Sequence, residues 1–152
     1  PCTNKFTVNR LLNYLPFTVH REPFTEKNKT KKNMKAESFE DLEVWKEGMR
    51  LTVEVYNLLK ECRDYGLRDQ MQRAAVSVPS NIAEGFERQT NKEFAQFLYI
   101  ARGSAAELRT QIYLAIQLNV IDKKVGMELV DKTKKIASML YRLIQARKTS
   151  TF

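Results

Sequence analysis

The chain has 152 residues, of which 43% are hydrophobic and 29% are charged, a composition typical of one soluble globular domain with a sizeable core. The formal net charge is +8 at pH 7, but residues 1–33 alone contribute seven basic and two acidic side chains. The remainder carries 19 basic against 16 acidic side chains, a surplus too mild to predict nucleic-acid binding by itself.

Residues 1–37 are predicted to form a basic, flexible N-terminal extension. From Glu22 to Lys35 the chain has almost no apolar residues, so burial cannot offset the entropy lost on ordering. The more apolar stretch from Phe6 to Val19 is interrupted by Pro16 and polar residues, and no small-residue cleavage site follows it, which argues against a secretory signal. Two interpretations stay open: a transit peptide, or an extension that is no part of the working domain.

Cysteine content and hydropathy indicate a cytoplasmic protein that is not associated with a membrane. Cys2 and Cys62 are 60 positions apart and form neither a disulfide framework nor a zinc motif, so a reducing cytoplasm is expected. No apolar run approaches the roughly 18 residues that a membrane-spanning helix needs, so no membrane association is expected.

The first predicted helix runs from about Phe39 to Cys62. Ser38 followed by Asp41 is a variant of the capping box that begins many helices. Apolar residues then recur at steps of three and four, the spacing of one buried helical face. This predicted face consists of Leu42, Trp45, Met49, Val53, Tyr56 and Leu59.

The second predicted helix begins near Leu67, ends near Phe86 and contains Pro79. Because proline lacks a backbone N–H and clashes with the carbonyl four residues earlier, we expect a kink, with the Ala75 carbonyl satisfied by a side chain or water. Gly85 either ends the regular helix or allows another backbone to approach closely. The predicted buried face consists of Met71, Ala74, Ala75, Val78, Ile82 and Phe86.

Two further helices follow. Thr90 and Glu93 form a full capping box for the third, and Asp122 caps the fourth. The small residues from Gly103 to Ala106 are expected to let a neighbouring helix pack closely. The third helix is predicted to bury Phe94, Phe97, Leu98, Ala101, Ala105, Leu108, Ile112, Ala115 and Leu118. The fourth is predicted to bury Val125, Leu129, Thr133, Ile136, Leu140 and Leu143.

These four long helices with short links predict an all-α fold, an up-and-down antiparallel four-helix bundle spanning residues 38–148. No segment alternates between apolar and polar residues as a β-strand does.

Several motifs in this order resemble one known family. They are Phe39-Glu-Asp-Leu-Glu-Val-Trp45, Arg73-Ala-Ala-Val-Ser77, Asn81-Ile-Ala-Glu-Gly85, Arg88, Phe97-Leu-Tyr-Ile-Ala-Arg-Gly-Ser104 and Glu107-Leu108. The family is the four-helix bundle family named for proteins encoded in intervening sequences of bacterial 23S ribosomal RNA genes. It is also similar to the accessory variability determinant of diversity-generating retroelements. The resemblance implies a cytoplasmic bacterial protein, a ring-shaped homopentamer and no known catalytic activity. In the retroelement branch it implies binding to nucleic acid and to a reverse transcriptase through a basic surface, from which this chain departs because its domain carries only +3.

Basic residues on the second and third helices are the candidate nucleic-acid-binding residues, because guanidinium groups can bind phosphates bidentately. The candidates are Arg88, Lys92, Arg102 and Arg109, and for each of them a solvated helix surface is the competing interpretation. Arg73, Asn81 and Glu84 are instead interpreted as a structural polar cluster beside the proline, with Glu84 and Arg88 at the spacing of a favourable helical ion pair.

The sequence predicts no catalytic residue, metal or cofactor. The only histidine, His20, lies in the extension, so the Glu-x-x-His pairs of a di-iron bundle are missing and the serines of the domain have no histidine base. The aromatic residues Trp45, Tyr56, Phe86, Phe94 and Phe97 are expected to be core rather than platforms for bases.

Apolar residues outside the predicted buried faces suggest helices buried on two sides, and therefore self-association. They are Val44, Val55, Tyr99, Ile100, Tyr113, Leu114 and Ile116. The leading hypothesis is a non-catalytic oligomeric module, a pentamer by resemblance, that binds RNA, DNA or a nucleic-acid enzyme through helices two and three. The alternative is a purely structural, self-assembling or protein-partner adaptor that binds no nucleic acid.

Overall fold

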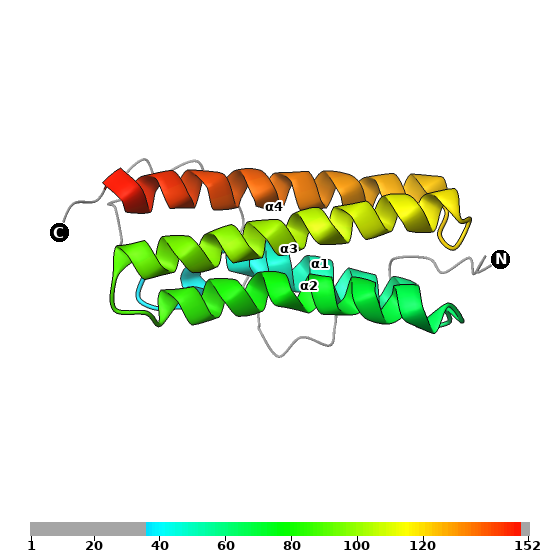
Figure 1. Cartoon of the computed structure of the whole chain (residues 1–152), viewed down its shortest axis with the longest axis horizontal. Helices are drawn as coiled ribbons and strands as arrows, with labels where there is room; N and C mark the ends of the chain where they lie inside the picture. The colour runs from blue at the N-terminus through cyan, green and yellow to red at the C-terminus, as the bar shows by residue number, and fades with distance from the viewer. Residues whose placement is uncertain (1–35, 150–152) are drawn as a thin grey trace, which may run out of the picture. The chain divides into compact units, whose positions relative to one another are not determined.

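The computed structural model describes residues 36–149, which form the expected all-α bundle. A 3-10 turn, η1 (Phe39–Asp41), precedes α1 (Glu43–Leu58), α2 (Tyr65–Phe86), α3 (Asn91–Gln117) and α4 (Lys123–Thr149). Each helix packs against its neighbours in chain order, and α4 returns to α1 (Figure 1). The α1–α4 contact is the smallest of the four, and no strand occurs within residues 36–149. Apart from its last two positions, the predicted N-terminal extension lies outside the described residues.

The first helix is shorter than predicted at both ends. The Asp41 carboxylate accepts a hydrogen bond from the Ser38 backbone N–H at 3.2 Å, but this cap closes only the short turn η1. Leu42 then has an extended backbone (φ −71°, ψ 117°) and serves as the N-cap of α1, so the turn and the helix are separate. At the other end α1 stops at Leu58, and the chain reaches Cys62 through a turn.

The predicted buried face of the first helix is wrong for three of its six residues. Met49, Val53 and Tyr56 are exposed. The buried face of α1 consists of Val44, Gly48, Leu51, Thr52 and Val55. The helix carries two apolar stripes at helical spacing, and the stripe with smaller side chains faces the core.

The second helix contains Pro79 within its regular span. Asp64 begins the helix by accepting a hydrogen bond from the Leu67 N–H at 3.0 Å. The prediction that a side chain satisfies the Ala75 carbonyl is confirmed, because Thr52 Oγ1 donates to Ala75 O at 2.9 Å across the α1–α2 boundary. The bend at Pro79 stays a prediction.

Close packing joins α2 to α3, and Gly85 is the residue that allows it. The helix continues past Gly85, and a Cβ placed there would lie 2.5 Å from Phe97 Cβ, so the glycine permits a close approach and does not end the helix. Farther along the same boundary, the hydroxyls of Ser77 and Ser104 lie 2.8 Å apart.

The capping prediction for α3 is confirmed, because Thr90 Oγ1 accepts from the Glu93 N–H at 3.2 Å and donates to the Glu93 carboxylate at 2.7 Å. Its buried face agrees with the sequence apart from Phe97, which is half-buried, and Leu118, which lies past the helix end and is 61% exposed. The expectation for Gly103 is wrong, since a Cβ there would meet nothing within 4 Å. Gly103 lies on the outer side of α3.

Asp122 caps α4 as predicted, accepting from the backbone N–H groups of Lys124 at 2.8 Å and Val125 at 3.2 Å. Val125 is nevertheless exposed, and the buried stripe begins at Gly126. A Cβ at Gly126 would lie 2.5 Å from Ile116 Cγ1, so this glycine allows the start of α4 to pack against the end of α3.

Candidate nucleic-acid interface

The four predicted phosphate-binding residues occupy different surroundings. Arg88 donates to the Glu84 carboxylate at 2.5 Å and its guanidinium lies 4.8 Å from the centre of the Phe97 ring. Arg102 is exposed, with Cζ 5.4 Å from the centre of the Tyr141 ring on α4. Lys92 is exposed and Arg109 is half-buried, and neither forms an ion pair with a described residue. The charge of Arg88 is therefore matched within the fold, whereas the other three cations remain available to a ligand.

The three residues of the predicted polar cluster do not meet. The Asn81 amide donates to Ser77 O at 2.7 Å and to Ser77 Oγ at 3.0 Å, which joins it to the α2–α3 boundary. Glu84 pairs with Arg88 instead. Arg73 is exposed on α2 and has no ion pair among the described residues. Asn81 alone thus belongs to the polar contact between helices.

The helix richest in basic residues in the described part of the chain is α4, which was not among the predicted binding helices. Between Lys123 and Thr149 it has eight lysines and arginines against two acidic residues. This excess is visible in the sequence as a local count, whereas the predicted binding residues all lie on the two preceding helices. The structure adds which side of α4 each cation occupies.

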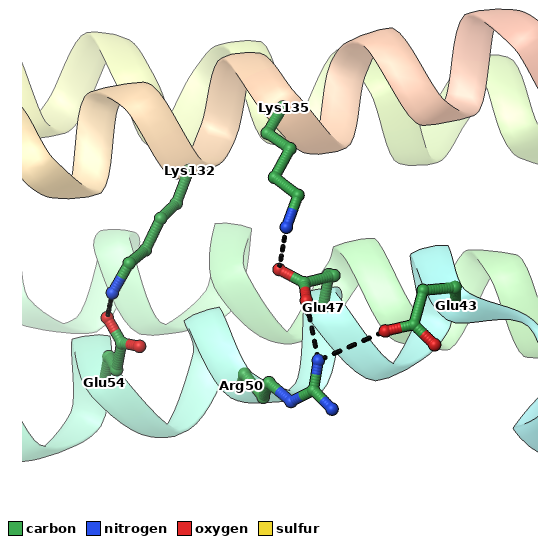
Figure 2. A network of polar contacts seen from close by, with 6 residues as sticks. All are labelled: Glu43, Glu47, Arg50, Glu54, Lys132 and Lys135. Atoms are coloured by element: carbon green, nitrogen blue, oxygen red, sulfur yellow. Dashed lines mark hydrogen bonds and ion pairs between the residues drawn. The ribbon is translucent and has the colours of Figure 1, made fainter. Parts of the chain in front are cut away.

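On the side facing α1, basic residues of α4 are neutralised by carboxylates (Figure 2). Glu47 binds Lys135 at 3.1 Å and Arg50 at 2.6 Å, and Glu54 binds Lys132. Burial raises the pKa of Glu47, but the hydrogen bonds and charges of Lys135 and Arg50 outweigh it and leave that pKa below its ordinary value. These lysines hold the smallest helix–helix contact together.

On the side facing α3, two cations of α4 meet aromatic rings, and one of them, Arg147, has its Cζ 5.1 Å from the centre of the Phe94 ring. Lys148 Nζ donates to Tyr99 Oη at 2.8 Å and lies 5.1 Å from the centre of that ring. One turn away Arg102 lies over Tyr141, so cation and ring come from opposite helices in both pairs. Such cation–π contacts contribute roughly 0.5–1 kcal/mol at exposed sites.

One more cation lies on the same side of α3. Arg109 follows Arg102 by seven residues, which is two turns along the helix. We define the cation–tyrosine seam as Tyr99, Arg102 and Arg109 on α3 with Tyr141 and Lys148 on α4.

The acidic residues of α3 are held within their own helix or its cap. Glu93 accepts from Thr90, and Glu107 accepts from the Gln111 side chain at 3.2 Å. Lys92, in the first turn, lies seven residues before Tyr99 and so extends the basic side of the seam by two turns. The seam therefore joins unmatched positive charge to exposed rings.

A second surface runs along the outer side of α3, where Ile100 and Leu114 are exposed as expected, with Gly103 between them. Tyr99, which belongs to the seam, and Tyr113 are also exposed as expected. The expectation is wrong for the three other residues of that set, because Val44 and Val55 are buried in the core and Ile116 is half-buried. The expectation that Tyr56 is core is also wrong, since it is exposed on α1 together with Met49 and Val53.

Groups that could support catalysis are scarce in the described region. No cluster of three or more His, Cys, Asp or Glu residues that could hold a metal ion occurs within residues 36–149. Cys62 is free and buried, with Sγ 3.8 Å from the Asp64 carbonyl oxygen. None of the helices in the described part of the chain is both long enough and apolar enough to cross a membrane.

Comparisons with known proteins agree with this architecture. The sequence model of the family described as 23S rRNA-intervening sequence protein matches residues 40–142. A solved structure from Bacteroides thetaiotaomicron VPI-5482, described as a protein of unknown function from the S23 ribosomal protein family, is similar with a TM-score of 0.64 and 23% sequence identity. That likeness covers 67% of this chain and 98% of the other, and at this identity it supports the fold alone. No curated protein matches the chain.

Proposed function

We propose a function for this chain, which belongs to the 23S rRNA-intervening sequence protein family. We infer that it is a non-catalytic, self-associating helical module that binds nucleic acid. Within the cell the proposal places it in the cytoplasm, in keeping with the free thiol of Cys62.

The cation–tyrosine seam is the observation that supports nucleic-acid binding. Arg102, Arg109 and Lys148 lie along one helix boundary and have no carboxylate partner among the described residues. Phosphates of a nucleic acid can supply that partner, and guanidinium groups bind them with geometric specificity. A seam of three or four cations supports weak binding, in line with the mild net charge of the domain.

The test is the salt dependence of binding to a labelled RNA, followed by fluorescence anisotropy. Neutralisation of about three phosphates of a single strand predicts a slope near 2 in log Kd against log salt, or about 20-fold weaker binding between 50 and 200 mM salt. The double variant Arg102→Gln with Arg109→Gln should bind more weakly and lower the slope to about 1.

Arg73→Gln is the matched control, because Arg73 is an exposed cation on α2, which does not contact α4. This variant should bind as the wild type does. Absence of binding at low salt, or equal losses in the control and the double variant, would refute the assignment of the seam.

Self-association is supported by the outer side of α3, where Ile100 and Leu114 are exposed around Gly103. Glu107 lies on the same side of the helix, seven residues from each of them, so this surface is apolar with one charged residue, and protein interfaces combine such residues. Light scattering should show a multimer, with a pentamer as the expected size, and Ile100→Glu with Leu114→Glu should dissociate it. Val53→Glu on α1 introduces the same charge on another exposed apolar position and should leave the multimer intact.

The same surface supports a second candidate function, a structural adaptor that binds a protein partner, such as a nucleic-acid enzyme of the reverse transcriptase type, and no nucleic acid. That candidate predicts association that is insensitive to salt, because apolar contact dominates it. A salt-resistant multimer with no RNA or DNA binding at low salt would favour the adaptor over our proposal.

A further inference from the structure

Two rings of the cation–tyrosine seam are not accounted for by phosphate binding. Tyr99 is 43% exposed and Tyr141 is 49% exposed, although both lie on helices whose buried faces are complete without them. Each ring is in contact with a cation of the opposite helix, which holds the ring beside the charge and leaves much of its surface open to solvent.

We propose that the seam binds a single-stranded nucleic acid, with bases stacked on Tyr99 and Tyr141 and with phosphates bound by Arg102, Arg109 and Lys148. This inference rests on the proposed function and deepens it, because it names the form of the ligand. Positive charge interleaved with aromatic rings is the combination that single-strand binding proteins use.

The spacing of the rings fits neighbouring nucleotides. Along α3, Arg102 at the level of Tyr141 lies three residues from Tyr99, whereas along α4 Tyr141 lies seven residues from Lys148, the partner of Tyr99. The two rings are therefore separated by roughly 5–10 Å along the helix axes. Neighbouring nucleotides of one strand rise by about 3.4 Å when stacked and lie farther apart when the strand extends. A strand that runs along the boundary can therefore present one base to each ring.

A duplex makes less use of the seam. Its bases already stack on one another, so tyrosine rings at the surface find no open base face. The phosphates of a duplex still bind the cations, and this electrostatic contribution to affinity weakens with salt as it does for a single strand. The tyrosines therefore select single strands, whereas the arginines and lysine provide affinity for either form.

The experiment compares three ligands with the full chain by fluorescence anisotropy at one low salt concentration. The ligands are a labelled RNA strand of about 15 nucleotides, the DNA strand of the same sequence, and the RNA annealed to its complement. Both single strands should bind several-fold more tightly than the duplex.

Tyrosine variants separate stacking from charge. Tyr99→Leu and Tyr141→Leu should each weaken single-strand binding by about tenfold with an unchanged salt slope, because no charge is lost. Tyr99→Phe and Tyr141→Phe should retain most of the affinity, since the ring remains. Tyr56→Leu, on a ring of similar exposure on α1, is the matched control and should bind as the wild type does. Circular dichroism of each variant checks that the bundle is folded.

The possible failures are distinguishable. If the wild type binds nucleic acid but the duplex binds as tightly as the single strands, or if the leucine variants lose no affinity, the stacking proposal is overturned while the proposed function stands. If no ligand binds at low salt, both are overturned.

Discussion

Thr52 and Pro79 are predicted to be energetically coupled through the carbonyl of Ala75. Pro79 has no N–H, so Ala75 O lacks its helical donor and accepts from Thr52 Oγ1 at 2.9 Å. The same hydroxyl also lies 2.9 Å from Gly48 O, but that carbonyl already has the ordinary helical partner within α1. The single hydroxyl proton is therefore needed by Ala75 O. Thr52→Val keeps the shape, leaves a buried acceptor unpaired and should cost about 1–3 kcal/mol of unfolding free energy.

In a Pro79→Ala background the same substitution should cost much less. Alanine restores an N–H that can bond to Ala75 O within α2, so Thr52 is no longer required for that purpose. A coupling free energy of about 1–2 kcal/mol between the two sites follows. The coupling free energy compares the cost of Thr52→Val in the two backgrounds, so the effect of Pro79→Ala on its own cancels. This cancellation matters because Pro79→Ala also changes helix propensity and the packing of α2 near Gly48.

The assay is urea unfolding of the wild type, both single variants and the double variant, followed by helical circular dichroism at one low protein concentration. Equal losses from Thr52→Val in the two backgrounds would show that the Ala75 carbonyl finds another partner, and would refute the reasoning. Unchanged m-values across the four proteins are needed for the comparison to hold.

Two further predictions concern glycines and an ion pair. Gly85→Ala should destabilise the bundle by up to about 2 kcal/mol, because the new Cβ would lie 2.5 Å from Phe97 Cβ and overpacking outweighs the propensity gain. Gly103→Ala, which meets nothing within 4 Å, should instead stabilise it by about 1 kcal/mol in the same urea assay; stabilisation by both changes would contradict the close packing at Gly85. Glu47→Gln should cost about 1 kcal/mol at pH 7 by removing the contact with Lys135. Because the folded pKa of Glu47 is depressed, its contribution is present above the ordinary value near 4.5 and is lost as pH falls through the folded pKa. Wild type and variant should therefore converge below that folded pKa, and a constant difference would refute the assignment.

The case of α1 shows why periodicity predicted the helices better than their faces. The stripe through Met49, Val53 and Tyr56 and the stripe through Leu51 and Val55 both follow steps of three and four. The larger residues suggested the first stripe as core. The Ala75 carbonyl, left without its helical donor by Pro79, takes a hydrogen bond from Thr52 on the second stripe. This contact depends on how α1 packs against α2, so the sequence of either helix alone does not predict which stripe is buried.

The cap predictions for α3 and α4 depend on a single segment each, and they agree with the structure. Caps at Thr90 and Asp122 are local, because the side chain and the N–H groups it bonds lie within three residues. The prediction that the Ala75 carbonyl needs a partner also followed from one segment, although the partner, Thr52, lies on another helix.

The candidate site divides in the same way. The pair of Arg88 with Glu84 lies within one helix and was predicted from the sequence, whereas the contacts of Arg102 and Lys148 with tyrosines depend on how α3 and α4 pack.

The distribution of charge around α4 removes the apparent conflict between a mild net charge and nucleic-acid binding. Carboxylates of α1 neutralise Lys132 and Lys135 on one side of the helix, whereas tyrosines accompany Lys148 on the other. Electrostatic interactions are screened beyond about 8–10 Å at physiological salt, so a ligand on the α3 side responds to the local cations and hardly to the acidic side chains across the bundle. A domain total of about +3 therefore understates the attraction at the seam. It follows that Lys132→Gln with Lys135→Gln, which lowers the net charge by two and leaves every cation of the seam in place, should leave RNA binding nearly unchanged, and a large loss of affinity would show that net charge governs binding.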